Sequence, residues 1–239
     1  MPVWSYGVVT IPSRISSGLL ETTLKYLANA GFPEPRLFID GFPNEALPDF
    51  AKVLAVTCRN PAFGTFCSFY LGVSELFLRN PKADFYALFQ DDCICCRNIR
   101  QYLEQCTLPE RSYLNLYTYP NNERGDVKGW SFSNQLGKGA VALVFVREVL
   151  VDLLRSPNWV NIPLFNDHPK EGWRKVDDGV IVEALRKCNV NEYVHLPSLV
   201  QHDNTVRSSL GHVKSPQANT FPGVDFDALS LLGAANASR

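Results

Sequence analysis

Residues 4–90 alternate short apolar runs with amphipathic stretches, a pattern typical of an α/β sheet covered by helices. The apolar runs WSYGVVTI, RLFID, KVLAV and DFYALF predict strands at 4–11, 36–40, 52–56 and 84–89. The last run is apolar on both faces, which suits a central strand of a parallel sheet. The chain is therefore predicted to form a doubly wound, mostly parallel sheet flanked by helices.

Two helices are expected between these strands. Residues 16–31 place Leu20, Leu24 and Leu27 on one face, with Ser16 or Ser17 available as the cap. Residues 65–79 carry aromatic and aliphatic side chains at a 3.6-residue period and stop at an Asn-Pro pair.

The second half of the chain is less regular. Strands are expected at 112–119 and 140–146, a short amphipathic helix at 178–187, and a final extended segment at 192–202. Without a repeat or a low-complexity linker, one domain over residues 1–212 is preferred, followed by a tail, 213–239. Within it, a nucleotide-binding half would cover about 1–95 and an acceptor-side half about 96–212.

Composition narrows the classes of function. The 239 residues carry a formal net charge of −1, which gives no indication of binding to nucleic acid. No apolar run reaches the roughly 20 residues that span a bilayer, so a soluble cytoplasmic protein without a transmembrane segment is expected, unless the sequence belongs to a longer anchored one. Three of the seven cysteines, Cys93, Cys95 and Cys96, lie too close together for an ordinary disulfide framework, and no second cluster completes a zinc site. They are expected to be packed thiols.

A polar cluster ends the most buried predicted strand. Gln90, Asp91 and Asp92 follow the apolar run directly, and ligands of open α/β sheets bind at the carboxyl ends of strands. Two adjacent carboxylates repel each other unless a positive group joins them, and a divalent cation with phosphate oxygens would do so. A helix cap or a surface turn is the alternative interpretation.

Other residues that could contact a ligand are expected near the same edge. The first strand ends in TIPSR, which places Thr10, Pro12 and Arg14 there, and an arginine can pair with a diphosphate. Gly139 precedes a buried strand and would let the backbone approach a ligand. Asp177 and Asp178 open the amphipathic helix, where a cap and a general base are equally good interpretations.

The order of these motifs resembles that of the GT-A glycosyltransferases, metal-dependent enzymes that use nucleotide sugars. QDD at 90–92 is similar to the family's DXD motif, with glutamine in the first position, and VDD at 176–178 is similar to its xED motif. The stretch PSLVQHDNTVRSSLGH resembles the PSL.QH...SS segment of the N-acetylglucosaminyltransferase IV group. The resemblance extends over residues 4–212 as scattered motifs.

The resemblance implies an inverting glycosyltransferase that moves a sugar from a nucleotide sugar, with UDP the expected nucleotide, to a hydroxyl acceptor such as a glycan. Asp92 and His202 would hold Mn²⁺ or Mg²⁺, and Asp178 would take the proton of the attacking hydroxyl. Acceptor binding is expected of Trp130 and Asp177, with Phe132 and Trp173 as further aromatic candidates. The residues expected to bind the nucleotide sugar are Thr10, Pro12, Arg14, Asp40, Arg59, Asn60, Gln90, Asp91 and Gly139.

Two other functions stay open. A metal-dependent hydrolase or phosphotransferase could use the same aspartates, with Asp177 and His168 as the remaining candidates for a second set of ligands. A non-catalytic carbohydrate-binding protein could also keep this fold, with Asp178 serving only as a helix cap.

Overall fold

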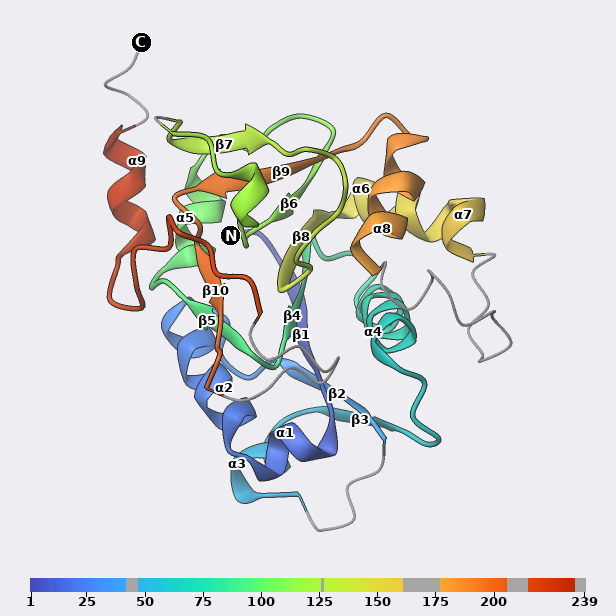
Figure 1. Ribbon diagram of the computed structural model, residues 1–239. Helices are drawn as coiled ribbons and strands as arrows, with labels where there is room; N and C mark the ends of the chain where they lie inside the picture. Colours follow the sequence, from blue (N-terminus) through green and yellow to red (C-terminus); the bar gives the residue numbers. More distant parts are fainter. Residues whose placement is uncertain (42–46, 126, 161–176, 206–214, 235–239) are drawn as a thin grey trace.

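The computed structural model describes residues 1–41, 47–125, 127–160, 177–205 and 215–234, with the side chains at 158, 160, 177, 178 and 234 outside that description. These residues form an eight-stranded mixed sheet in the order β3-β2-β1-β4-β8-β6-β9-β7, with helices on both faces (Figure 1). The predicted α/β architecture with a mostly parallel sheet is confirmed.

The first half of the chain builds the parallel part of the sheet, because β2 and β4 flank β1 and β3 flanks β2, all in parallel register. Val9 lies opposite Gln90 and Asp40 opposite Arg59, so the carboxyl ends of four strands meet at one edge. The elements are β1 (Trp4–Thr10), α1 (Pro12–Ser16), α2 (Leu19–Asn29), β2 (Arg36–Asp40), α3 (Asp49–Lys52), β3 (Val56–Arg59), α4 (Thr65–Arg79) and β4 (Phe85–Gln90).

The second half widens the sheet. Strand β8 is antiparallel to β4 and β6, β9 is parallel to β6, and β7 is antiparallel to β9. A separate two-stranded sheet pairs β10 with β5, and this brings His202 opposite Cys93. The elements are β5 (Cys93–Cys95), α5 (Ile99–Gln105), β6 (Ser112–Asn115), β7 (Gly129–Phe132), β8 (Ala142–Val146), α6 (Arg147–Arg155), α7 (Pro157–Val160), α8 (Asp177–Arg186), β9 (Asn191–Leu196), β10 (Val200–His202) and α9 (Leu231–Ala234), with short 3₁₀ turns at Pro120–Asn122 and Ala228–Ser230.

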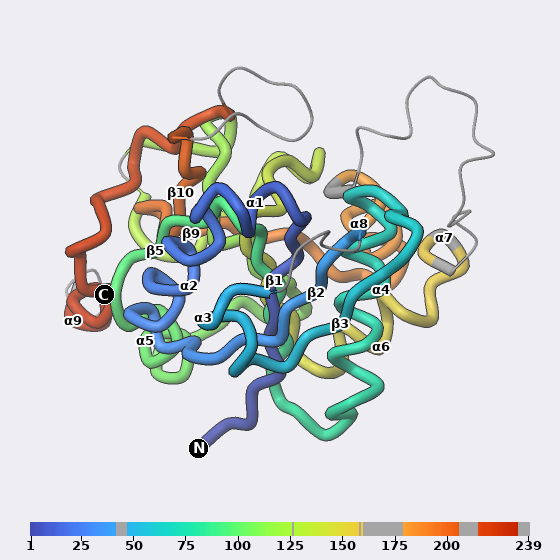
Figure 2. The backbone as a smooth tube through the Cα atoms, turned by 90° about the horizontal axis from the view of Figure 1, so that it is seen from below, coloured from blue at the N-terminus to red at the C-terminus, as the bar shows by residue number. Residues whose placement is uncertain are grey.

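Side chains of the central strands alternate between two cores. In β4, Ala87 and Phe89 join the core beneath α2 and α5, while Tyr86 and Leu88 join the core beneath α4, α6 and α8. Figure 2 shows α2 and α5 on one side of β1 and α4 and α6 on the other. Burial on both faces explains why this strand reads as a continuous apolar run.

Several predicted boundaries were wrong. The run at 52–56 is not a strand, because a short helix, α3, begins after Pro48 and strand β3 begins only at Val56. The helix predicted at 16–31 is divided, since Gly18 adopts a left-handed φ of 77° and takes the N-cap position of α2 in place of either serine. Strand β6 ends at Asn115, four residues before the predicted end. The helix at 65–79 is confirmed, and α8 begins one residue before its predicted start.

The C-terminal residues that the structure describes pack against the sheet that carries β5. Ala218 and Ala228 are buried, the Arg97 amide donates to the carbonyl of Phe226, and the Ala228 amide donates to the carbonyl of Arg97. Among the described residues, no helix is long and apolar enough to cross a membrane.

Candidate functional site

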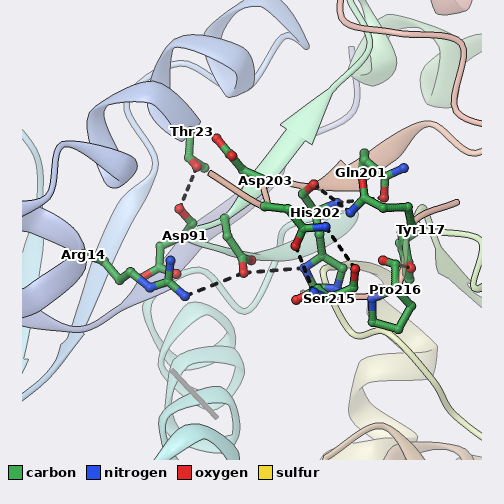
Figure 3. Close-up of polar contacts among 12 residues, drawn as sticks. Arg14, Thr23, Asp91, Tyr117, Gln201, His202, Asp203, Ser215 and Pro216 are labelled. Atoms are coloured by element: carbon green, nitrogen blue, oxygen red, sulfur yellow. Dashed lines mark hydrogen bonds and ion pairs between the residues drawn. The ribbon is translucent and has the colours of Figure 1, made fainter. Parts of the chain in front are cut away.

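Three segments far apart in the sequence meet at the carboxylate of Asp92. Arg14 comes from α1, Asp92 follows β4, and His202 ends β10. Figure 3 shows the side chains of Arg14 and His202 directed toward the same site. Arg14 Nη2 lies 4.0 Å from Asp92 Oδ2, and His202 Nδ1 lies 3.5 Å from the same oxygen. All three side chains are at most 12% exposed. The structure therefore brings together the predicted diphosphate partner and both predicted metal ligands.

Each of these three side chains carries a buried polar atom without a hydrogen bond among the described residues. Arg14 Nη1, Asp92 Oδ1 and His202 Nδ1 are buried and receive no hydrogen-bond partner from the described part of the chain. Buried polar atoms are normally paired, and those that are not call for an explanation such as an ion or ligand. An arginine beside a carboxylate and an imidazole offers donors to an anion and acceptors to a cation at the same place.

The donor set fits a divalent cation. Two ligands at about 2.1 to 2.2 Å from one ion lie roughly 3.0 to 3.5 Å apart, and the separation of His202 Nδ1 and Asp92 Oδ2 falls at the end of that range. Mixed oxygen and nitrogen ligation suits Mn²⁺. Among the described residues no cluster of three or more His, Cys, Asp or Glu could hold a metal ion, so phosphate or water oxygens would have to complete the coordination.

Asp91 has different surroundings from Asp92. Its Oδ2 accepts a hydrogen bond of 2.7 Å from Thr10 Oγ1, and its backbone carbonyl accepts one of 2.7 Å from Thr23 Oγ1. Burial, and then repulsion from Asp92, raises the pKa of the Asp91 carboxyl to about 7, although hydrogen bonds from Thr10 and the charge of Arg14 oppose the shift. Asp91 thus links the ends of β1 and β4.

The other predicted nucleotide contacts lie at the neighbouring strand ends. Asp40 accepts hydrogen bonds of 2.8 Å from the amides of Phe63 and Gly64, one at each carboxylate oxygen, so it fixes the turn before α4. Arg59 is buried over the ring of Phe38, and burial lowers its pKa. These roles in binding a nucleotide stay predictions, as do those of Pro12, Asn60 and Gln90, which lie at the same edge.

Gly139 lies against a side chain of the site. A Cβ at this position would lie 2.3 Å from Tyr117 Cδ1, and the φ of Gly139 is +80°. The Tyr117 ring in turn packs edge-on against the His202 ring at a centroid distance of 5.1 Å. The close approach for which this glycine is needed in the structure is to Tyr117.

The predicted acceptor side is described only in part. Trp130 lies in β7 and packs edge-on against the His195 ring at 4.9 Å, while Phe132 is exposed on the same strand. The backbone of α8 begins at Asp177, but the side chains of Asp177 and Asp178 lie outside the described part, as do His168 and Trp173. Their proposed roles stay predictions.

The cysteines are packed as expected. Cys93, Cys95 and Cys96 are buried, with 3.5 Å between the Sγ atoms of Cys93 and Cys95. Burial raises the pKa of the Cys96 thiol to about 12, so this thiol is a packed side chain and a poor ligand.

Three residues that support the site were not predicted from the sequence: Thr23, Tyr117 and Gln201. Thr23 and Tyr117 have no local signal, because only the fold brings them to Asp91 and His202. Gln201 lies inside the PSLVQH motif, and its Oε1 accepts a 3.0 Å hydrogen bond from the His202 amide.

No protein-family model matches the sequence, and no curated protein shows significant similarity to it. Solved structures of transferases do share its chain path at low identity. GalNAc-T7, solved with UDP, GalNAc and Mn²⁺, has a TM-score of 0.48 at 12% identity over 82% of this chain and 42% of its own. A glycosyltransferase involved in the glycosylation of the major capsid of PBCV-1 has a TM-score of 0.46 at 9% identity, covering 81% and 82% of the two chains. A nucleotidyl transferase from Methanothermobacter thermautotroptrophicus has a TM-score of 0.46 at 12% identity, covering 81% and 86%. At these values the likeness concerns the path of the chain alone.

Proposed function

We propose that the protein is a metal-dependent glycosyltransferase that moves a sugar from a nucleotide sugar, preferably a UDP-sugar, to a hydroxyl group of a glycan or another acceptor. The convergence of Arg14, Asp92 and His202, with a buried unpartnered polar atom on each, carries this proposal. A cation site beside an arginine is suited to a diphosphate, since the substrate oxygens would satisfy both.

Each residue of this cluster has a distinct role in the proposal. Asp92 and His202 would hold Mn²⁺ or Mg²⁺, and the bound ion would supply Lewis-acid stabilisation to the leaving diphosphate. Arg14 would donate to diphosphate oxygens through Nη1, which has no partner among the described residues. Asp91, held by Thr10, would lie beside the donor sugar or ribose. The nucleotide would be contacted by Arg59, Asn60 and Asp40.

On the acceptor side, Asp178 is proposed as the general base. Its backbone belongs to the first turn of α8, where the helix dipole would stabilise an ionised carboxylate. A base on the face opposite the leaving group implies a single displacement with inversion at the anomeric carbon. Asp177, Trp130 and Gly139 would shape the acceptor and donor pockets around it.

Release of nucleotide from a panel of UDP- and GDP-sugars, with Mn²⁺ and then with chelator, tests the proposal. We expect UDP release to require Mn²⁺ and an acceptor. Asp92→Ala should lose metal-dependent nucleotide binding, whereas Asp178→Asn should keep binding and lose transfer. Asp49→Asn is the matched control, because Asp49 is exposed and pairs only with Lys52 among its described neighbours.

Other outcomes would identify the alternatives. Release of the nucleoside monophosphate and a sugar 1-phosphate from the same donors without an acceptor would indicate a hydrolase that cleaves the diphosphate with water. Binding of sugars without any release would indicate a carbohydrate-binding protein. If no sugar nucleotide binds by calorimetry in the presence of Mn²⁺, the transferase proposal is wrong.

A further inference from the structure

His202 is held at its backbone by two glutamine side chains. Gln201 Oε1 accepts a hydrogen bond of 3.0 Å from the His202 amide, and Gln217 Nε2 donates one of 3.2 Å to the His202 carbonyl. On its other side, β10 pairs with β5, with His202 opposite Cys93. Both backbone polar groups of this residue are therefore fixed by side chains from the strand itself and from the C-terminal part of the chain.

The partner of Gln201 is a segment that follows in the sequence, residues 215–218. Gln201 Nε2 donates to the Ala218 carbonyl at 3.0 Å, and the Ala218 amide donates to Gln201 Oε1 at 3.2 Å. The side-chain amide of Gln201 thus pairs with both backbone polar groups of Ala218, as the backbone of a neighbouring strand would. Gln201 is 6% exposed and Ala218 5% exposed, so these bonds are shielded from water.

The same segment is fixed at its start by Asn204. Asn204 Nδ2 donates to the Ser215 carbonyl at 3.0 Å, and the Ser215 amide donates to Asn204 Oδ1 at 2.9 Å. Tyr117 adds a third attachment, because its hydroxyl donates to the Pro216 carbonyl at 2.7 Å while its ring packs against His202 (Figure 3). Segment 215–218 is therefore connected to the backbone of His202 through Gln201 and Gln217 and to its ring through Tyr117.

We propose that Gln201 and segment 215–218 form a positioning element that orients the His202 imidazole toward Asp92, so that metal affinity depends on this C-terminal segment. The inference rests on the proposed metal site of Asp92 and His202. Residues that fix a ligand's orientation commonly change metal affinity 10- to 100-fold when they are replaced. The dependence should be strong here, because two protein ligands leave little to compensate for a displaced imidazole.

A titration of the full chain with Mn²⁺ in the presence of UDP tests this inference, with electron paramagnetic resonance used to measure the bound Mn²⁺. Gln201→Met keeps the volume and removes the three hydrogen bonds, and we expect Mn²⁺ affinity to fall about tenfold or more. Gln217→Ala removes one bond from an exposed side chain, and we expect a loss of about threefold. Asn219→Ala is the control, because Asn219 lies in the same stretch but bonds to Glu123, and it should bind as the wild type does.

A double-mutant cycle separates positioning from general destabilisation. In a His202→Ala background, Gln201→Met should have no further effect on Mn²⁺ affinity. In the protein that keeps His202, Gln201→Met should weaken the coupling between Mn²⁺ and the imidazole nitrogen in the pulsed spectrum. If Gln201→Met does not fold, Gln217→Ala, whose side chain is exposed, still carries the test through the same cycle.

The possible failures are distinct. If the wild type does not bind Mn²⁺ with UDP, the proposed function is wrong and the inference falls with it. If the wild type binds Mn²⁺ and both glutamine variants bind it as tightly as the wild type does, only the inference is overturned. Equal losses in the wild-type and His202→Ala backgrounds would also overturn it, because Gln201 would then act by another route.

Discussion

Tyr117 connects the loop before β8, which contains Gly139, to the candidate metal ligand His202. Its ring lies against Gly139 on one side and against His202 on another, and it is fully buried. Since buried rings have little room to move, a change at Gly139 is transmitted to the imidazole. The loop before β8 can therefore affect the site without contacting a ligand.

Gly139→Ala should be more harmful than an ordinary change at a glycine. The new Cβ would lie 2.3 Å from Tyr117 Cδ1, and alanine would have to adopt the left-handed backbone conformation of this position, with a φ of +80°. We expect a loss of about 2 to 4 kcal/mol in the free energy of unfolding, and weaker Mn²⁺ binding. Gly129→Ala is the control, since Gly129 also has a positive φ and no described atom within 4 Å of its added Cβ.

Denaturant unfolding and Mn²⁺ titration of both variants check this prediction. Gly129→Ala should lose about 1 kcal/mol and bind Mn²⁺ normally. Equal behaviour of the two variants would show that the contact with Tyr117 is unimportant.

His195 is a buried neutral histidine away from the candidate metal site. Its Nδ1 lies 2.7 Å from the Pro197 carbonyl, which can only accept, so Nδ1 carries the proton and Nε2 accepts from the Tyr102 hydroxyl at 2.8 Å. Burial lowers the pKa of His195 to about 4, although the bond to Pro197 opposes the shift. The folded protein thus resists protonation of this ring.

Acid should therefore destabilise the wild type through His195. The unfolded chain binds a proton here below pH 6.5 and the folded chain only near pH 4, so stability is lost as the pH falls between these values. We expect a loss of about 3 kcal/mol relative to His195→Gln, measured by denaturant unfolding from pH 7.5 to 4. Taking the difference removes other titrating groups that the two proteins share. Parallel curves would show that His195 does not contribute.

Hydrophobic periodicity correctly predicted the helices and strands whose side chains are buried in a regular pattern. Helix α4 has a single apolar face and β4 is buried on both faces, and both were found from the sequence. The run at 52–56 was misread because Val53 is exposed on the turn between α3 and β3, where its apolar character says nothing about burial. Only tertiary contacts decide such cases.

The candidate site was predictable only in its parts. Asp92 follows from a buried strand that ends in carboxylates, and Arg14 from the turn after β1. The proximity of His202 depends on the pairing of β10 with β5, which has no local sequence pattern and was suggested by the motif resemblance alone. The support from Gln201, Tyr117 and segment 215–218 depends on the same long-range pairing.

The reactivity of the cysteine thiols in and beside β5 tests the pairing of β5 with β10. Cys58 is exposed, whereas Cys93, Cys95 and Cys96 are buried, so a thiol reagent should modify Cys58 first and the other three roughly a hundredfold or more slowly. Asp92 precedes β5 and His202 ends β10, so a cation bound to both should slow modification further. Mass spectrometry of labelled peptides measures this, and Asp92→Asn should abolish the effect of Mn²⁺. Rapid labelling of all three buried thiols would contradict the packing of β10 on β5.

One sheet joins a parallel half and a mixed half of the molecule. Strands β1 and β4 belong to the parallel half, while the chain reaches β10 only after passing through β6 and β9. A ligand that contacts Arg14, Asp92 and His202 would therefore connect segments from both halves of the chain. Such a ligand should stabilise the entire fold.

Mn²⁺ and UDP together should consequently raise the melting temperature of the protein. At about 100 times the dissociation constant, binding adds about 2.7 kcal/mol, which corresponds to about 5 to 10 °C for a chain of 239 residues. Each ligand alone should give a smaller shift, because the diphosphate and Asp92 share the cation. Differential scanning calorimetry measures the shift, and Asp92→Asn should show no joint effect. The same rise with chelator in place of Mn²⁺ would mean that the nucleotide binds without the cation, and Asp92 and His202 would then need another role.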